Sequence, residues 1–259
     1  MVALAILVIV LWMLREVKQG ANLSYDTILT AALVGIPSGV VLSKLLHVVD
    51  NIVVAKLHPE LALAGSVVDY TQYPELILSR GGLTIYGAVL GAALGIWIYS
   101  KFSDFKFGYF TDLVAPAVIL AQAIGRVGCT INGCCYGIKA PSWLLGAIIY
   151  SPKYPPPDGY QVDLNLLGKA LYPTQPYELI FCLIILGILL KLRGRFKPDG
   201  SLFLIYLGLY SLWRVGIDFL RAGTPFLFGL HQAQMMGLVV LAIIIPLLAL
   251  RTRRVKAGV

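Results

Sequence analysis

Seven apolar segments, separated by polar connections, constrain this fold more than any other feature of the sequence. They span roughly residues 1–14, 27–49, 81–100, 111–128, 176–192, 201–220 and 229–250. A helix of about 20 apolar residues crosses a bilayer and pairs its backbone polar groups within itself. The sequence therefore predicts an all-α integral membrane protein with about seven transmembrane helices, in which residues 1–259 form one polytopic membrane domain.

The first segment is short for a membrane span. We expect a retained helix here, which is either tilted or begins upstream of residue 1. A signal peptide is the alternative, but no positively charged region precedes the segment and no small-residue cleavage pattern is clear.

The distribution of charge supports a membrane protein and excludes a nucleic-acid partner. Of the 259 residues, 58% are hydrophobic and 13% are charged, whereas soluble domains carry about 25% charged residues. The net charge of +8 would suit nucleic acid. The basic residues lie largely at the ends of apolar segments, however, where they act as topology signals.

Basic residues also orient the chain. Twelve of the 21 lie in four short segments, at 15–18, 101–106, 191–197 and 251–256. With seven spans, all four segments fall on the same side, and the positive-inside rule makes that side the cytoplasm. We therefore expect an outside N-terminus, a cytoplasmic C-terminus, and outer-face loops at 50–80 and 129–175. Within the second loop, the apolar residues 142–150 are too few to span and suggest an interfacial helix.

Arg126 marks a candidate site inside this membrane domain. It follows the apolar run 113–124 and opens a glycine-rich stretch, 125–137. A guanidinium stays charged at any accessible pH, and at membrane depth it needs an anionic partner or a wet cavity. Glycines allow the backbone to approach a ligand closely. Together these features predict a membrane cavity that holds a phosphate.

Further polar residues lie at the same predicted depth. Arg214 and Asp218 are four residues apart, so they share a helix face and can pair; a purely structural ion pair is the alternative. Arg221 follows at the outer interface, where snorkelling alone could explain it. Three arginines at one depth exceed what structure requires, and their forked geometry suits phosphate or carboxylate. Glu178 opens the fifth span, where we expect an arginine partner, or else a stabilising position at a helix N-terminus.

The four cysteines support no firm functional assignment. Cys129, Cys134 and Cys135 fall at the outer surface, where a disulfide could form, and Cys182 lies in a span. A zinc site would need a fourth ligand, and no histidine is near in sequence. We therefore expect small apolar packing residues here, and no metal.

Four segments of the chain, at 81–87, 125–137, 172–178 and 210–221, carry glycine, arginine and other polar residues in motif-like spacings. In these segments, and in their order, the chain resembles the prolipoprotein diacylglyceryl transferases of the bacterial inner membrane. The family's arginines are retained at Arg126, Arg214 and Arg221. Other retained positions are Asn132, Gly137, Gln175, Tyr177, Glu178 and Tyr210.

Several positions depart from the family's motifs. Tyr86 and Tyr172 stand where the family has histidines, Cys129 and Cys134 where it has Asn and Glu, and Asp218 where it has Glu. The phosphate-handling residues thus look intact, and the proton-handling residues look altered.

The resemblance implies a multi-pass enzyme of the bacterial inner membrane. Its donor would be phosphatidylglycerol, entering from the membrane lipids, and its acceptor the lipobox cysteine of a prolipoprotein signal peptide. A thioether would form and glycerol phosphate would leave, with no cofactor required. Arg126, Arg214 and Tyr86 would be catalytic. The substrate-binding residues would be Arg126, Asn132, Gly137, Gln175, Tyr177, Glu178, Tyr210, Asp218 and Arg221. The alternative is a diverged relative that binds or transports an anionic lipid without this transfer.

Overall fold

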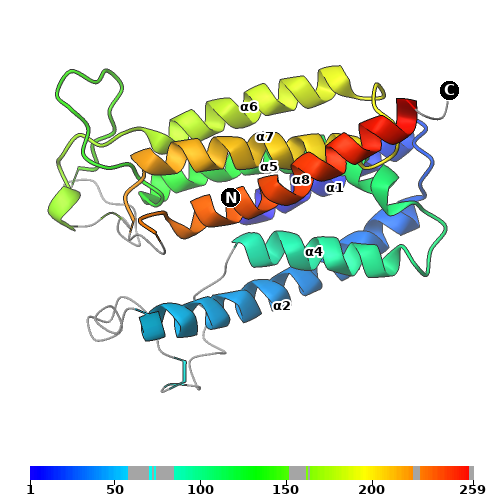
Figure 1. The fold of residues 1–259 in the computed structure, drawn as a ribbon, viewed down its shortest axis with the longest axis horizontal. Helices are drawn as coiled ribbons and strands as arrows, with labels where there is room; N and C mark the ends of the chain where they lie inside the picture. Colours follow the sequence, from blue (N-terminus) through cyan, green and yellow to red (C-terminus); the bar gives the residue numbers. More distant parts are fainter. Residues whose placement is uncertain are drawn as a thin grey trace. The chain divides into compact units, whose positions relative to one another are not determined.

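The computed structural model describes residues 1–57, 70–71, 73, 85–151, 162, 164–223 and 228–256, with the backbone alone for 2, 57, 85–86, 164 and 251–256. The described residues form seven α-helices and no β-strand (Figure 1). The helices are α1 (Val2–Lys18), α2 (Tyr25–Leu57), α4 (Ile85–Tyr99), α5 (Phe107–Asn132), α6 (Thr174–Leu192), α7 (Ser201–Ile217) and α8 (Gln232–Lys256).

Each helix coincides with one of the seven apolar segments. Five of them are long and apolar enough to cross a membrane: α2, α5, α6, α8, and α7 taken through Leu220. The other two, α1 with 17 residues and α4 with 15, are shorter. The chain is therefore an all-helical membrane protein.

The chain divides into two compact units. One unit, residues 17–107, contains α2 packed against α4. Two glycines of α4, four residues apart, lie in this contact: an added methyl group at Gly87 would lie 2.7 Å from the Leu42 carbonyl, and one at Gly91 would overlap the backbone of Ser38. Small residues on one helix face let the two helix backbones approach closely.

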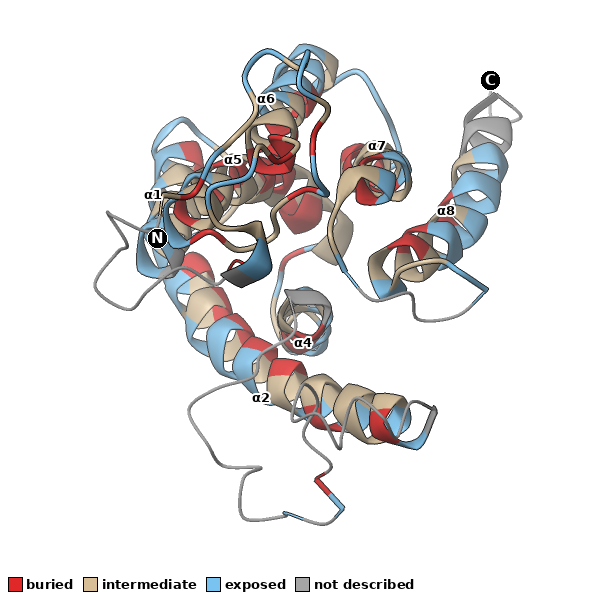
Figure 2. Ribbon diagram, turned by 90° about the vertical axis from the view of Figure 1, so that its left-hand side faces the viewer, coloured by how far each residue is buried: buried red, intermediate tan, exposed pale blue. Residues whose placement is uncertain are grey.

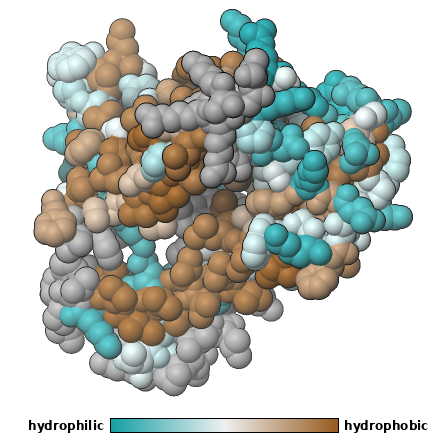
Figure 3. Space-filling view, turned by 45° about the vertical axis from the view of Figure 1, so that its right-hand side comes forward, coloured by the Kyte–Doolittle hydropathy of each residue, from teal (hydrophilic) through white to brown (hydrophobic). Residues whose placement is uncertain are grey.

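The other unit, residues 1–16 and 108–259, contains the candidate site. Its core lies between α5, α6 and α7 and consists of Ala115, Ile119, Ala123, Cys182, Ile185, Leu189, Leu202 and Tyr206. Figure 2 shows buried residues on the facing sides of these helices and exposed ones on their outer sides. Many exposed residues are large and apolar, such as Ile184 and Ile243. Figure 3 shows hydrophobic side chains gathered on the surface of the molecule. A surface of this kind suits contact with lipid tails rather than water.

A capping carboxylate and an ion pair join the helix ends at one end of this unit. The Asp112 carboxylate accepts hydrogen bonds from the backbone N–H groups of Gly200 (2.7 Å) and Phe203 (2.9 Å) at the start of α7. Arg193, just after α6, pairs with Glu16 of α1. These contacts hold the ends of four helices together at the end where basic residues cluster.

The loop that joins α5 to α6 lies at the opposite end. Isolated antiparallel bridges pair Gly137 with Arg221, and both Lys139 and Ile148 with Leu171. The expectation of an interfacial helix at 142–150 is wrong, because this stretch forms turns. Gly146 adopts a left-handed φ of 82°, and Ile148 exchanges backbone hydrogen bonds with Leu171. Both features are incompatible with continuous helical hydrogen bonding.

Candidate functional site

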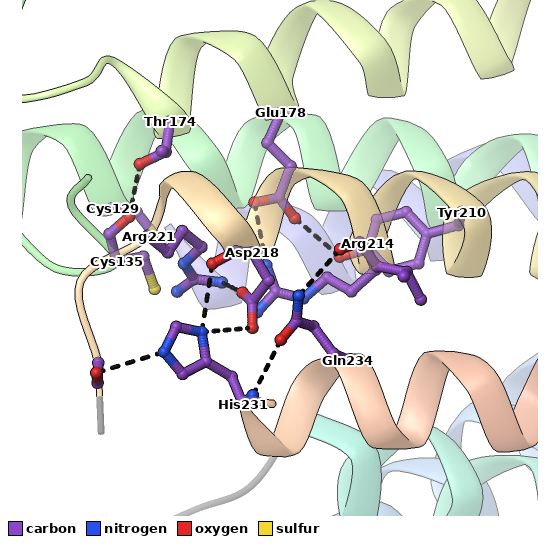
Figure 4. A network of polar contacts seen from close by, with 12 residues as sticks. Cys129, Cys135, Thr174, Glu178, Tyr210, Arg214, Asp218, Arg221, His231 and Gln234 are labelled. Atoms are coloured by element: carbon purple, nitrogen blue, oxygen red, sulfur yellow. Dashed lines mark hydrogen bonds and ion pairs between the residues drawn. The ribbon is translucent and has the colours of Figure 1, made fainter. Parts of the chain in front are cut away.

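A network of buried charged residues lies where four helices of this unit meet (Figure 4). Its members come from the end of α5, the start of α6, the end of α7 with the 3₁₀ turn η3 (Asp218–Leu220), and the residues just before α8. Because successive helices run in opposite directions, residues far apart in sequence reach the same end of the unit.

Arg126 and Glu178 form the first part of the network. The Arg126 Nη2 atom lies 2.7 Å from Glu178 Oε1, in an ion pair between α5 and α6. The Tyr210 hydroxyl donates a hydrogen bond of 2.9 Å to the same oxygen and lies 3.4 Å from Arg126 Nη2. The expected arginine partner of Glu178 is therefore present. The side chain of Glu178 is only 2% exposed, so pairing is what makes its burial possible.

Arg214 links this group to the second carboxylate. Its Nη1 atom lies 3.6 Å from Glu178 Oε2, and its Nη2 atom lies 3.1 Å from Asp218 Oδ1. The predicted pairing of Arg214 with Asp218 across one helical turn is confirmed. The guanidinium also bridges two helices, which its sequence spacing alone does not show.

Asp218 is the second centre of the network. Its Oδ1 atom lies 3.5 Å from Arg221 Nη1, and its Oδ2 atom lies 3.2 Å from His231 Nδ1. The Asp218 side chain is 4% exposed and is thus held among three basic groups. The other ring nitrogen of His231 lies 3.3 Å from the Gly223 carbonyl oxygen. Both ring nitrogens of His231 therefore face oxygen atoms.

The network carries an excess of positive charge. Among the described residues it contains three guanidinium groups and two carboxylates, which gives +1 with a neutral His231. The three arginine side chains are only 11%, 11% and 12% exposed. Unbalanced charge at membrane depth is costly. The arrangement therefore favours the binding of an anion, and forked guanidinium donors match the oxygens of a phosphate.

Backbone pairing fixes the approach to this network. The Ile138 N–H donates to the Leu220 carbonyl (2.9 Å), and the Ala222 N–H donates to the Tyr136 carbonyl (3.1 Å). Gly137 lies between these bonds, opposite Arg221, and an added Cβ atom there would lie 2.9 Å from the Leu220 carbonyl. A glycine is thus required for the loop to lie against the backbone that carries Arg221.

The start of α6 holds the end of this loop. The Gln175 amide nitrogen donates to the Cys134 carbonyl at 2.9 Å and to the Tyr150 hydroxyl at 3.0 Å. The Thr174 hydroxyl donates to the Cys135 carbonyl at 2.9 Å. Both donors are 1% exposed. Gln175, predicted as a substrate-binding residue, therefore makes a buried structural contact.

The other predicted site residues lie outside these contacts. Asn132 is exposed at the end of α5, and Tyr177 is half-buried in the first turn of α6. No hydrogen bond from either side chain joins the described network. The side chain of Tyr86 falls outside the described residues, as do Gly81 and Gly82.

Sequence reasoning missed His231 and Gln234. The Gln234 side chain accepts a hydrogen bond from the His231 N–H (2.9 Å) and donates to the Val215 carbonyl (3.2 Å), which joins α8 to α7. The place of His231 in the sequence could have identified it. His231 lies at the start of the last apolar segment, on the side of the membrane domain where Arg126 and Arg221 lie. Alternating helix directions predict the same depth for all three.

Three free cysteines adjoin the network. The Sγ atoms of Cys129, Cys134 and Cys135 all lie within 4.8 Å of one another. Arg126 Nη1 lies 3.8 Å from Cys129 Sγ. In the loop, hydrogen bonding from Cys129 and Cys134 lowers the pKa of the Cys135 thiol, and the charges of Arg221 and Arg126 lower it further.

Comparison with known proteins identifies the family. A family model described as prolipoprotein diacylglyceryl transferase matches residues 1–250. The chain belongs to this family. A phosphatidylglycerol–prolipoprotein diacylglyceryl transferase of Dehalococcoides mccartyi is 43% identical over 257 residues, which cover 99% of this chain and 89% of the relative. Family members from Clostridium tetani and Corynebacterium efficiens carry the same name. They are 33% and 31% identical, over 87% and 100% of this chain and 80% and 79% of their own lengths.

Proposed function

We propose that the buried arginine network is the site at which this chain handles its lipid donor. The chain is a transferase of lipoprotein biogenesis, which moves the diacylglyceryl group of phosphatidylglycerol onto a prolipoprotein. The finer assignment is that the acceptor is the lipobox cysteine thiol, that a thioether forms, and that glycerol phosphate leaves.

One observation supports the placement of the donor: three buried guanidinium groups are balanced by only two carboxylates. Phosphatidylglycerol carries one negative charge on its phosphate, which offsets the surplus. A lipid that enters sideways from the bilayer brings this phosphate to the depth of the network without crossing hydrocarbon. The acyl chains then remain among the apolar outer faces of the helices.

The chemistry requires stabilisation of a leaving phosphate. The acceptor sulfur attacks the glyceryl carbon, the bond from that carbon to the phosphate oxygen breaks, and its electrons stay on the phosphate. Negative charge on the leaving group grows during this step, and preorganised cationic donors stabilise such charge. We assign this role to Arg126 and Arg214, with Arg221 binding the phosphate. Glu178, Asp218 and Tyr210 then act as positioning residues, because they fix the guanidinium groups before the lipid arrives.

The acceptor thiol must lose its proton to become a good nucleophile. The family histidine position carries Tyr86 in this chain, and we keep Tyr86 as the candidate proton acceptor. The growing phosphate charge supplies a second destination, since the departing glycerol phosphate is more basic than the diester from which it forms. Asn132, Gly137, Gln175 and Tyr177 complete the proposed substrate-binding set, with Gly137 and Gln175 acting through the loop.

A transfer assay in vesicles tests the proposal. Purified protein is reconstituted with phosphatidylglycerol labelled in an acyl chain, and a peptide that carries a lipobox cysteine is added. We expect label to move to the peptide through a bond that is stable to hydroxylamine, as a thioether is. A cysteine-to-serine peptide and vesicles of phosphatidylcholine are the controls. Binding of the labelled lipid without transfer would favour the alternative, a relative that only binds or transports an anionic lipid.

We further propose a multi-pass location in the bacterial inner membrane, with the N-terminus outside and the C-terminus in the cytoplasm. The four basic clusters support this orientation. It exposes the network toward the side on which secreted prolipoproteins present their signal peptides.

A further inference from the structure

We propose that Cys129, Cys134 and Cys135 form a site for a thiophilic d¹⁰ metal ion such as Zn²⁺ or Cd²⁺, and that occupation of this site inhibits the transferase. The binding site stands on the geometry of the three thiols alone. The inhibitory effect rests on the proposed function of the neighbouring arginine network.

The three sulfur atoms are close to metal-ligating geometry. A zinc–thiolate bond is about 2.3 Å long, so three sulfurs around one tetrahedral ion lie about 3.8 Å apart. Here all three Sγ atoms lie within 4.8 Å of one another. Each sulfur needs to shift by less than about 1 Å, within the reach of one side-chain torsion. A water molecule would complete the coordination, as in other zinc sites with three protein ligands.

The backbone around the thiols is held in place before any metal binds. Cys134 N–H donates to the Cys129 carbonyl (3.1 Å), which folds the loop back onto the end of α5. Buried Thr174 and Gln175 fix the carbonyls of Cys135 and Cys134. Cys135 itself adopts a left-handed φ of 59°, a conformation that non-glycine residues adopt only when their surroundings hold them there. The loop therefore brings the thiols together at a conformational cost that simple packing does not require.

Access and charge also favour a metal. All three cysteines are only partly buried, whereas Cys182 is fully buried in the core. Binding of M²⁺ by three thiols releases three protons and leaves a metal–thiolate unit with a net charge of −1. Thiolates are soft ligands that prefer zinc and its heavier relatives to magnesium or calcium. Arg126, which lies 3.8 Å from Cys129 Sγ, offsets the negative charge of that unit.

This charge balance links the metal to the lipid site. The arginine network has a surplus of one positive charge, which the donor phosphate is proposed to neutralise. A metal–thiolate unit beside Arg126 supplies the same negative charge and so competes electrostatically with the phosphate. For two unit charges about 8 Å apart, at an effective dielectric constant of about 20, Coulomb's law corresponds to a change in phosphate affinity of roughly 10- to 100-fold. Metal binding should therefore inhibit transfer at low donor concentration.

The experiment uses the full chain in detergent, purified under reducing buffer and freed of metal with a chelator. Cd²⁺ is titrated while the ultraviolet cadmium–thiolate absorbance is recorded. We expect one Cd²⁺ per chain in the wild type and in the matched control Cys182→Ala. The triple variant Cys129→Ser/Cys134→Ser/Cys135→Ser should lose the absorbance. The single variant Cys134→Ser should show reduced intensity and affinity, and it guards against misfolding of the triple variant.

The site would be overturned by the absence of cadmium–thiolate absorbance in the wild type, or by an unchanged absorbance in the triple variant. A disulfide among the three cysteines after reducing purification, with no metal bound, would also overturn it. Transfer is then measured with and without Cd²⁺. We expect inhibition that a chelator reverses in the wild type and that is absent from the triple variant, each compared with its own metal-free rate. Because metal binding is measured spectroscopically, an inactive wild type would count against the proposed function and not against the site.

Discussion

Replacement of Arg126 by alanine is the sharpest test of the arginine network. The change removes the ion pair of 2.7 Å with Glu178 and lowers the charge of the network from +1 to 0. Loss of one preorganised donor to a developing oxyanion costs about 10²–10³ in kcat, or about 2.7–4 kcal/mol. We expect a loss of transfer in this range. Weaker donor binding should follow as well, because the surplus charge that attracts the phosphate is gone.

Arg126→Ala also affects stability, so the two effects must be separated. Breaking a buried ion pair typically costs about 3–5 kcal/mol, because a charge is left unpaired. Here Glu178 keeps the Tyr210 hydroxyl at 2.9 Å and Arg214 at 3.6 Å. The destabilisation should therefore fall at or below the low end of that range, and folded protein should still be recovered.

Arg193 provides a matched control at the other end of the same unit. It forms an arginine–carboxylate pair with Glu16 of α1, away from the network. Arg193→Ala should destabilise the unit but leave the transfer rate per folded molecule near that of the wild type. Arg126→Lys keeps the charge but lacks the guanidinium fork, so it should restore little activity. The assay is label transfer to the lipobox peptide, normalised to protein that elutes as a folded species. Near wild-type transfer by folded Arg126→Ala would remove Arg126 from the mechanism.

Three further predictions concern the rest of the chain. Arg214→Ala should lose transfer strongly and Asp218→Asn less, because Asp218 acts by orienting the arginine; equal losses of folded protein with normal specific activity would make the pair structural. Cys129→Ser/Cys134→Ser should keep substantial transfer, since the attacking sulfur belongs to the acceptor; a linked Cys129–Cys134 peptide in non-reducing mass spectrometry, with activity lost on reduction, would contradict this. A tag at Val259 should be reached only after the membrane is permeabilised, and labelling of intact cells would refute the proposed orientation.

The sequence predicts the helices well because one physical requirement dominates them. Backbone N–H and C=O groups in hydrocarbon must form hydrogen bonds within a helix. Apolar runs such as 176–192 and 201–220 therefore become helices whichever apolar side chains they carry. The loop stretch 142–150 is different. Its apolar residues suggest an amphipathic helix, but Gly146 and the pairing of Ile148 with Leu171 decide its conformation. That pairing joins residues distant in sequence and has no local signal.

The sequence predicts which charged residues belong to the site, but not which ion pairs they form. The cost of an arginine at membrane depth identifies Arg126, Arg214 and Arg221 one by one. Arg214 and Asp218 follow from helical spacing. The bridge from Arg214 to Glu178, however, depends on how α6 packs against α7. The contact of Asp218 with His231 depends on the turn that connects α7 to α8.

Asp218 shows why that turn matters. The α-helix α7 ends at Ile217; the 3₁₀ turn η3 that follows contains Asp218, and Arg221 comes directly after this turn in an extended conformation. This turn lets one short carboxylate contact Arg214 and Arg221 through Oδ1 and His231 through Oδ2. Aspartate stands here where the family's motif has the longer glutamate. The shorter acid and the histidine before α8 therefore form one arrangement, in which His231 takes up the second oxygen of a carboxylate that already binds two arginines.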